Sequence, residues 1–220
     1  MSTLVIFAKA PQPSAAKTRL IPALGAEGAA DLARRMLVHT LQQALAAGAG
    51  PVELCMSPAP GNKAWQGVAL PAGVTCTAQG EGDLGQRMAR AVARITRQQQ
   101  SVLLFGTDCP ALAAAHLAEA GRQLARHDAV LLPAADGGYI LIGLKTPCPA
   151  LFTDMTWSTS AVAAETQRRM AALGLRVWQG PTLHDIDEPA DLAHLPLEFQ
   201  EKQASSAMNT GASSYTVDSK

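Results

Sequence analysis

The stretch LVIFAKAPQPSAAKTRL, residues 4–20, joins a short apolar run to a loop with three basic side chains. Residues 4–8 are apolar and include β-branched side chains, which is typical of a strand. Lys9, Lys17 and Arg19 follow in what we call the basic loop (residues 9–19). Ligands of open α/β sheets bind beyond the carboxyl ends of the strands, and three cations suit a polyphosphate. The loop therefore predicts a phosphate site, the alternative being a solvated surface loop.

Beyond this loop, short β-like runs alternate with longer helical patterns along the chain. Strands are predicted over 4–8, 52–57, 73–79, 102–106, 129–133, 139–144 and 175–178, and helices over 27–47, within 80–100, over 113–126 and over 160–173. Such alternation predicts an α/β sheet with right-handed crossovers. We expect one domain over residues 1–198 and a disordered tail over 199–220, which is rich in Ser, Thr and Ala.

Composition excludes several classes of function. The 220 residues carry no net charge and only 4% are aromatic, so neither a basic field nor a stacking surface favours nucleic acid as a partner. The four cysteines are scattered without metal-ligand spacing, which predicts reduced thiols in a cytoplasmic protein. No stretch is long and apolar enough to span a membrane. The oligomeric state stays open.

Four carboxylates follow predicted strands and are candidate ligands for a divalent cation. Asp108 stands just after the apolar run 102–106, and Asp136 precedes the run 139–144. Asp185 and Asp187 alternate, so both point to one face of an extended segment. Carboxylate oxygens are the ligands that Mg²⁺ and Mn²⁺ prefer beside substrate phosphates. Asp108 and Asp187 have an alternative role as helix caps.

Glycine-rich turns and one tryptophan complete the candidate site. Gly82 and Gly85 lie in GEGDLGQRM (80–88), a turn that could admit a flat base or a ribose. Gly137 and Gly138 separate two apolar runs, where they either allow close approach to a ligand or form a tight turn. Trp157 precedes a helix start and either stacks on a sugar or covers the core.

Taken in order, these motifs resemble a known bacterial family. The matching segments are FAKAPQPSAAKTRL, GDLGQRM, GTDCPAL, ADGGYILIGL, WST and DIDEPADL, and together they span about residues 3–192. The chain is similar to the glycosyltransferase-A-like (GT-A) proteins of uncertain function, called selenodomain-associated or DUF-type transferases. The resemblance implies a three-layer α/β/α Rossmann-like fold of the nucleotide-diphospho-sugar transferase superfamily. Two positions depart from it: Ser14 replaces the usual glycine, and Ala135 replaces an acidic residue.

The resemblance also assigns roles to the matching residues. It implies that the loop with Lys9, Lys17 and Arg19 binds nucleotide phosphates and that Asp108 binds metal. We expect Lys9, Lys17, Arg19 and Asp136 to be catalytic, and Asp185 and Asp187 to complete the metal site with Asp108. The nucleotide would contact Ala8, Lys9, Lys17, Thr18, Arg19, Gly82, Asp83, Gly85, Arg87, Thr107 and Asp108. The acceptor would contact Gly137, Gly138, Tyr139, Trp157, Ser158 and Thr159.

Two reactions are compatible with these loops. One is glycosyl transfer from a nucleotide sugar, and the other is nucleotidyl transfer from a nucleoside triphosphate to a phosphorylated acceptor; both would use Mg²⁺ or Mn²⁺. The family label favours the first reaction, whereas the basic loop and the single aspartate of GTDCP favour the second. The alternative is a nucleotide-binding or regulatory module that has lost catalysis, which the missing acid at Ala135 suggests.

Overall fold

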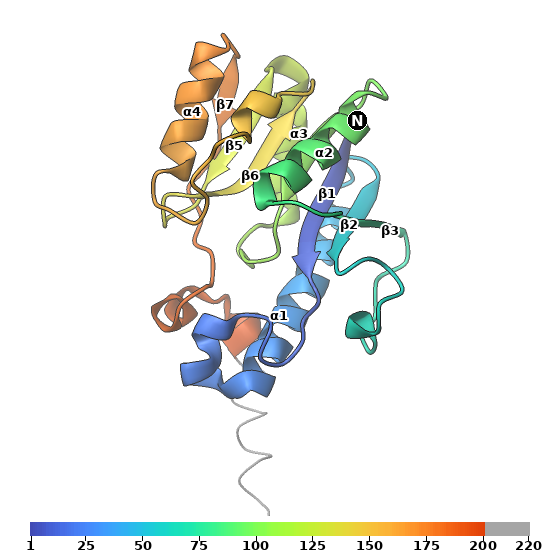
Figure 1. Ribbon diagram of the computed structural model, residues 1–220, viewed down its shortest axis with the longest axis vertical. Helices are drawn as coiled ribbons and strands as arrows, with labels where there is room; N and C mark the ends of the chain where they lie inside the picture. Colours follow the sequence, from blue (N-terminus) through green and yellow to red (C-terminus); the bar gives the residue numbers. More distant parts are fainter. Residues whose placement is uncertain (201–220) are drawn as a thin grey trace, which may run out of the picture.

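The computed structural model describes residues 1–200, so the predicted tail from residue 201 onward lies outside the described residues. Seven strands form one sheet in the order β3-β2-β1-β4-β6-β5-β7 (Figure 1). Their bounds are Ser2–Lys9 (β1), Val52–Ser57 (β2), Val74–Ala78 (β3), Ser101–Phe105 (β4), Ala129–Pro133 (β5), Tyr139–Leu144 (β6) and Val177–Gln179 (β7). The predicted α/β class with a mostly parallel sheet is confirmed.

One strand of the sheet runs against the others. β6 is antiparallel to both β4 and β5, whereas the remaining neighbours pair in parallel. The reversal follows from the connection between β5 and β6, which is only five residues long and contains Gly137 at a positive φ of 92°. A parallel pair needs a long crossover, so such a short connection forces a hairpin. The start of β6 therefore lies at the same edge as the carboxyl ends of β1 and β4.

Four helices cover the two faces of the sheet. They are α1 (Ile21–Ala46), α2 (Leu84–Thr96), α3 (Ala114–Arg126) and α4 (Val162–Ala172). Apolar side chains of α1 and α3 pack in one core cluster, and those of α2 and α4 pack in another. β1 feeds both clusters, with Ile6 in the first and Val5 in the second, as period-two alternation requires. The result is a three-layer α/β/α arrangement (Figure 1).

A third apolar cluster lies beneath the basic loop. Leu20, Leu32 and Met36 pack there with Ile186 and Phe199 from the far end of the chain. Phe199 is only 4% exposed, so the packed part of the chain continues past the boundary predicted at residue 198. This contact brings the segment after β7 next to the loop after β1, although more than 160 residues separate the hydrogen-bonded Lys17 and Ile186. Within residues 1–200, no helix is long and apolar enough to cross a bilayer.

The bounds of most predicted elements hold within one or two residues, and those of β2, β5 and β6 coincide with the prediction. The main difference is α1, which begins at Ile21 and not at residue 27. Pro22 occupies the first turn, where its missing N–H costs no hydrogen bond. Gly25 then adopts φ 70° and ψ 168°, which kinks the helix. The apolar periodicity becomes regular only after this kink, so the first turn was hidden in the sequence.

Candidate active site

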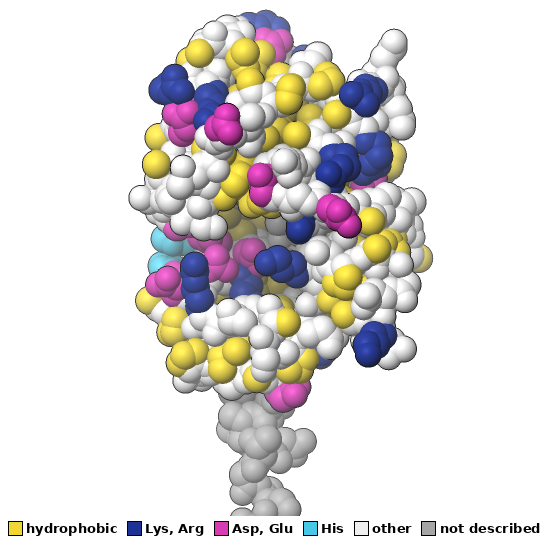
Figure 2. Space-filling model, viewed as in Figure 1, with side chains coloured by type: hydrophobic (Ala, Val, Ile, Leu, Met, Phe, Trp, Pro, Cys, Tyr) yellow, Lys and Arg dark blue, Asp and Glu magenta, His cyan; other side chains and the backbone are white. Residues whose placement is uncertain are grey.

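A cleft of about 880 Å³ opens at the edge of the sheet where β1 and β4 end. Its walls come from the basic loop, the start of α2, the residues after β4, the start of β6 and the segment around Trp157. Figure 2 shows a hollow across the middle of this face with basic and acidic side chains gathered around it. Cations and carboxylates thus share one cavity. The cleft lies where ligands bind in open α/β sheets.

Most residues predicted for the site line this cleft. They are Ala8, Lys9, Lys17, Thr18, Arg19, Gly82, Asp83, Arg87, Thr107, Asp108, Asp136, Gly138, Tyr139, Trp157, Ser158, Thr159 and Asp187. Asp185 lines a smaller pocket that shares several residues with the cleft. The chain therefore brings its phosphate, metal and acceptor candidates into one connected space.

Two predicted glycines lie outside the lining and serve packing. Gly85 is buried in α2, where a Cβ atom would stand 2.3 Å from the carbonyl oxygen of Phe152. Gly137 has φ 92°, and its Cβ would stand 2.1 Å from the carbonyl oxygen of Ser160. Both positions need a residue without a side chain because other backbone approaches closely. They fix the positions of the neighbouring segments and do not border the cleft themselves.

Lys17 is the most constrained cation of the basic loop. It adopts φ 47° and ψ 44°, the left-handed region, and its side chain is 8% exposed. Its Nζ atom lies 2.5 Å from Asp108 Oδ1 and 2.6 Å from Asp187 Oδ1. Burial acts to lower the pKa of Lys17, but the charges of the two carboxylates outweigh burial and raise it. Lys17 therefore remains charged.

These ion pairs answer the question of whether the two aspartates cap helices. The helix after Asp108 is capped at Ala113, and Glu188 stands at the start of the turn after Asp187. Neither Asp108 nor Asp187 has the capping role that the sequence left open; both pair with Lys17.

The other two cations of the loop remain available to a ligand. Lys9 is exposed and forms no ion pair with any residue in 1–200, and Arg19 reaches only Glu188, at 3.9 Å. Arg19 and Glu188 are each 65% exposed, and an exposed pair at this distance is weak. Ser14, for which the resemblance implies glycine, has φ 60°. Glycine takes that conformation without strain.

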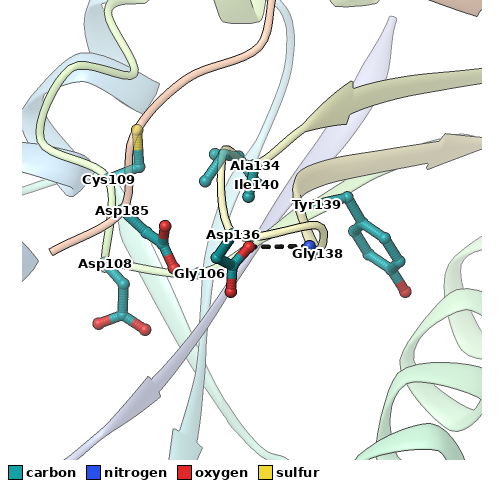
Figure 3. Close-up of a pocket in the computed structure, with 9 residues that line it drawn as sticks. All are labelled: Gly106, Asp108, Cys109, Ala134, Asp136, Gly138, Tyr139, Ile140 and Asp185. Carbon is teal, nitrogen blue, oxygen red and sulfur yellow. Dashed lines mark hydrogen bonds between the residues drawn. The ribbon is translucent and has the colours of Figure 1, made fainter. Parts of the chain in front are cut away.

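Three carboxylates line the smaller pocket, which has a volume of about 120 Å³ (Figure 3). Asp108 follows β4, Asp136 lies in the β5–β6 turn, and Asp185 lies on the segment after β7. Asp136 Oδ1 accepts a hydrogen bond of 2.8 Å from the Gly138 amide, which fixes the turn. In Figure 3 the carboxylates of Asp136 and Asp185 approach the same space, whereas Tyr139 points away from them.

The raised pKa of Asp185 shows that the carboxylates of this pocket repel one another. Burial, together with the charges of Asp136, Asp187 and Asp108, raises the pKa of Asp185 to about 6. The pocket thus holds more negative charge than its protein neighbours balance. A cation placed among these oxygens would relieve that excess.

The residues present fit a hard divalent cation by their chemistry. Carboxylate oxygens of Asp108, Asp136 and Asp185 are ligands that suit Mg²⁺ or Mn²⁺. Within the described residues, no three His, Cys, Asp or Glu side chains already converge as a ligand set. The three residues predicted to bind metal, Asp108, Asp185 and Asp187, do not form one group. Lys17 lies between Asp108 and Asp187, and Asp185 faces Asp136.

The raised pKa of Asp185 predicts a stability change that depends on pH. A raised acid destabilises the fold once pH rises through its folded pKa, because the buried group must then ionise. In metal-free protein, Asp185→Asn should therefore raise the free energy of unfolding by about 1–2 kcal/mol at about pH 7.5, after allowance for partial solvent screening. The gain should fall by more than half at about pH 4.5, where folded Asp185 is protonated.

Urea unfolding at the two pH values measures this effect. Asp31→Asn is a suitable control, because Asp31 is exposed on α1 and pairs only with Arg34. A gain for Asp185→Asn that is equal at both pH values would contradict the assignment of the strain to ionisation.

Sequence reasoning missed several residues of the cleft. Gln79 lies at the end of β3 and its buried amide donates to the carbonyls of Ala8 and Cys55, which ties three strand ends together. Its position as the last residue of the strand predicted over 73–79 was the available signal. Cys109 lines the Asp185 pocket, and burial raises its pKa to about 12, so it stays a neutral thiol. Its neighbour Asp108 gave the only hint of it.

Comparison with known proteins agrees with the architecture. Residues 40–159 match the family DUF2064, described as an uncharacterized protein conserved in bacteria. No curated protein matches the chain. A solved structure from Desulfovibrio desulfuricans G20, named "putative nucleotide-diphospho-sugar transferase", is 30% identical with a TM-score of 0.77. The match covers 86% of this chain and 84% of that chain.

Two more distant structures share the fold. A cytidylyltransferase from Leptospira borgpetersenii is 14% identical with a TM-score of 0.57, and the match covers 100% of both chains. The manganese complex of Rv0371c from Mycobacterium tuberculosis is 14% identical with a TM-score of 0.50, and the match covers 94% of this chain and 100% of that chain. At this identity the likeness concerns the fold.

Proposed function

The chain belongs to the bacterial family DUF2064, and on this premise we propose that it is a transferase that uses an activated nucleotide. Its other partners would be a divalent cation, Mg²⁺ or Mn²⁺, and a small-molecule acceptor. The observation that carries the proposal is the shared cleft, in which the free cations Lys9 and Arg19 and the carboxylate of Asp108 line one cavity. Polyphosphate binding and cation binding are both needed for reactions of nucleoside triphosphates.

We favour nucleotidyl transfer as the reaction. An oxygen of the acceptor phosphate would attack the α-phosphorus of a nucleoside triphosphate, the α–β bridging bond would break, and pyrophosphate would leave. Lys9 and Arg19 would neutralise charge on the phosphoryl oxygens and hold the triphosphate in line. The basic loop after β1 and the single aspartate of GTDCP support this reaction over glycosyl transfer.

The carboxylates have distinct proposed parts. Asp108 and Asp185 would hold the cation, which when bound supplies charge neutralisation for the phosphates. Asp136, exposed at the rim of the same pocket, would contribute a further oxygen to the cation or accept a proton from the acceptor phosphate if that phosphate is protonated. Trp157, Ser158 and Thr159 border the cleft on the side of the acceptor proposed here. The manganese complex of a protein with the same fold supports a divalent cation.

Glycosyl transfer from a nucleotide sugar is the second candidate. The observation that favours it is the 30% identity to a structure named as a nucleotide-diphospho-sugar transferase. In that reaction the same cations and Asp108 would stabilise the departing nucleoside diphosphate.

A thermal-shift panel separates the two reactions. Nucleoside triphosphates and nucleotide sugars are each tested with and without Mn²⁺. A ligand at about a hundred times its Kd adds about 2.7 kcal/mol of stability, which shifts the Tm measurably. We expect Mn²⁺-dependent stabilisation by one triphosphate, followed by pyrophosphate release when phosphorylated acceptors are added. Stabilisation by a nucleotide sugar alone would favour glycosyl transfer, and no response to either class would favour a degenerate binding module.

A further inference from the structure

The ammonium of Lys17 is fully engaged by the protein. Besides Asp108 Oδ1 and Asp187 Oδ1, its Nζ atom donates to the carbonyl oxygen of Ile186 at 2.7 Å. An ammonium has three N–H donors, so none remains for a ligand in this arrangement. Lys17 lines the cleft beside the exposed cations Lys9 and Arg19, yet its ammonium is held by carboxylates and is nearly excluded from solvent.

The surroundings of Lys17 differ on its two sides. Its own side chain is 8% exposed, whereas those of Asp108 and Asp187 are 51% and 42% exposed. The carboxylates therefore face the cleft with accessible oxygens, while the ammonium neutralises them from behind. Its left-handed backbone is unfavourable for a residue other than glycine, so this placement is maintained against a local preference.

We propose that Lys17 is an exchangeable internal counter-ion, which holds Asp108 and Asp187 until a divalent cation binds and then releases Asp108. The released ammonium then has a donor free for a nucleotide phosphate. The carboxylates keep a positively charged partner throughout, because the divalent cation takes the place of the singly charged ammonium. This inference rests on the proposed function for the identity of the cation and the phosphate.

Exchange of Lys17 between Asp108 and a phosphate would make the binding of the divalent cation and of the nucleotide phosphate cooperative. A lysine that stays with Asp108 would not have this effect. A cation that binds alone must displace the ammonium from Asp108, whereas a phosphate that draws Lys17 away leaves the carboxylate open. By linkage, each ligand must then raise the affinity for the other by the same factor. Lys17→Met removes both the competitor and this source of coupling.

The first test measures Mn²⁺ affinity without nucleotide, by electron paramagnetic resonance of free Mn²⁺. Lys17→Met should bind Mn²⁺ about tenfold more tightly than the wild-type protein, because a like charge beside Asp108 is gone. Lys9→Met is the matched control: it removes one charge from the same loop, but Lys9 pairs with no described carboxylate. Its Mn²⁺ affinity should change less than about twofold. If Lys17→Met binds Mn²⁺ as tightly as the wild-type protein or more weakly, the proposal is wrong and Lys17 has only a structural role.

The second test needs only the wild-type protein and so does not depend on how a variant folds. Brief labelling with an amine-reactive reagent, read by mass spectrometry, should modify Lys17 several-fold faster when saturating Mg²⁺ is present. Lys9 and Lys63, both exposed, serve as internal controls whose labelling should stay constant. Unchanged labelling of Lys17 would overturn the exchange. Neither test uses nucleotide. A negative result in either test can therefore be distinguished from a failure to find transferase activity.

Discussion

An Asp108→Asn protein is expected to lose metal-dependent transfer by at least about a thousandfold while it keeps its fold, in line with the several kcal/mol that a cation supplies to phosphoryl chemistry. Asp108 lines both the cleft and the smaller acidic pocket, as Asp136 does, and it is the one of the two that follows β4. The amide of asparagine has the same shape but loses the charge that a divalent cation requires. Lys17 would keep its contacts with Asp187 and Ile186, so we expect little change in stability.

Turnover measured by pyrophosphate release, with and without Mn²⁺, checks this result. Asp154→Asn is the matched control, since Asp154 is exposed and lies away from the cleft lining. Its φ of 49° suits asparagine as well as aspartate. An Asp108→Asn protein with ordinary Mn²⁺-dependent turnover would remove Asp108 from the cation site and leave Asp136 and Asp185 to be tested.

Local patterns in the sequence were sufficient for the strands and for most of the cleft. Buried strands appear as continuous apolar runs, such as VLLF in β4, and the loops that follow them carry the polar residues of the site. Because strand ends meet at one edge, Lys9, Asp108 and Asp136 could be placed together without knowledge of their distances. The hairpin that reverses β6 was not predicted, since a Gly-Gly turn is compatible with several connections.

Contacts between distant segments could not be read from the sequence. Lys17 and Asp187 are 170 positions apart, and no local pattern records that the third apolar cluster brings them together. The sequence could therefore propose phosphate for Lys17 and a metal or a cap for Asp187, but not their pairing. The same holds for Asp185, whose raised pKa depends on its burial and on carboxylates that include Asp136 and Asp108 from two other loops.

A buried ion pair that anchors α2 provides the largest expected change in stability. Glu53 is the second residue of β2 and is 5% exposed. Arg94 of α2 donates to both of its carboxylate oxygens, at 2.9 Å for Oε2, and Thr77 donates to Oε1 at 2.6 Å. The hydrogen bonds that Arg94 donates to Glu53 raise the pKa of Arg94, which remains charged. The pair thus neutralises a carboxylate that the sheet removes from water.

Arg94→Met should lower the free energy of unfolding by about 2–3 kcal/mol, since it leaves a buried carboxylate without its partner; partial exposure of Arg94 keeps the value below that of a fully buried pair. Urea unfolding measures the loss. Arg122→Met is the control, because Arg122 is 67% exposed and pairs with Glu119 at the surface of α3. A surface pair of this kind contributes less than about 1 kcal/mol.

The double variant Glu53→Gln with Arg94→Met distinguishes a missing partner from lost packing. If the unpaired charge causes the loss, removing it should recover about half or more of the stability, because a neutral amide costs less to bury. A loss that persists in the double variant would instead assign the effect to the aliphatic part of Arg94. The result matters for the cleft, because α2 carries Asp83 and Arg87 in its wall, and this pair holds the helix against β2. If the fold depends on the Glu53–Arg94 pair, then contacts within the protein fix the α2 wall of the cleft, and ligand binding is not needed to position it.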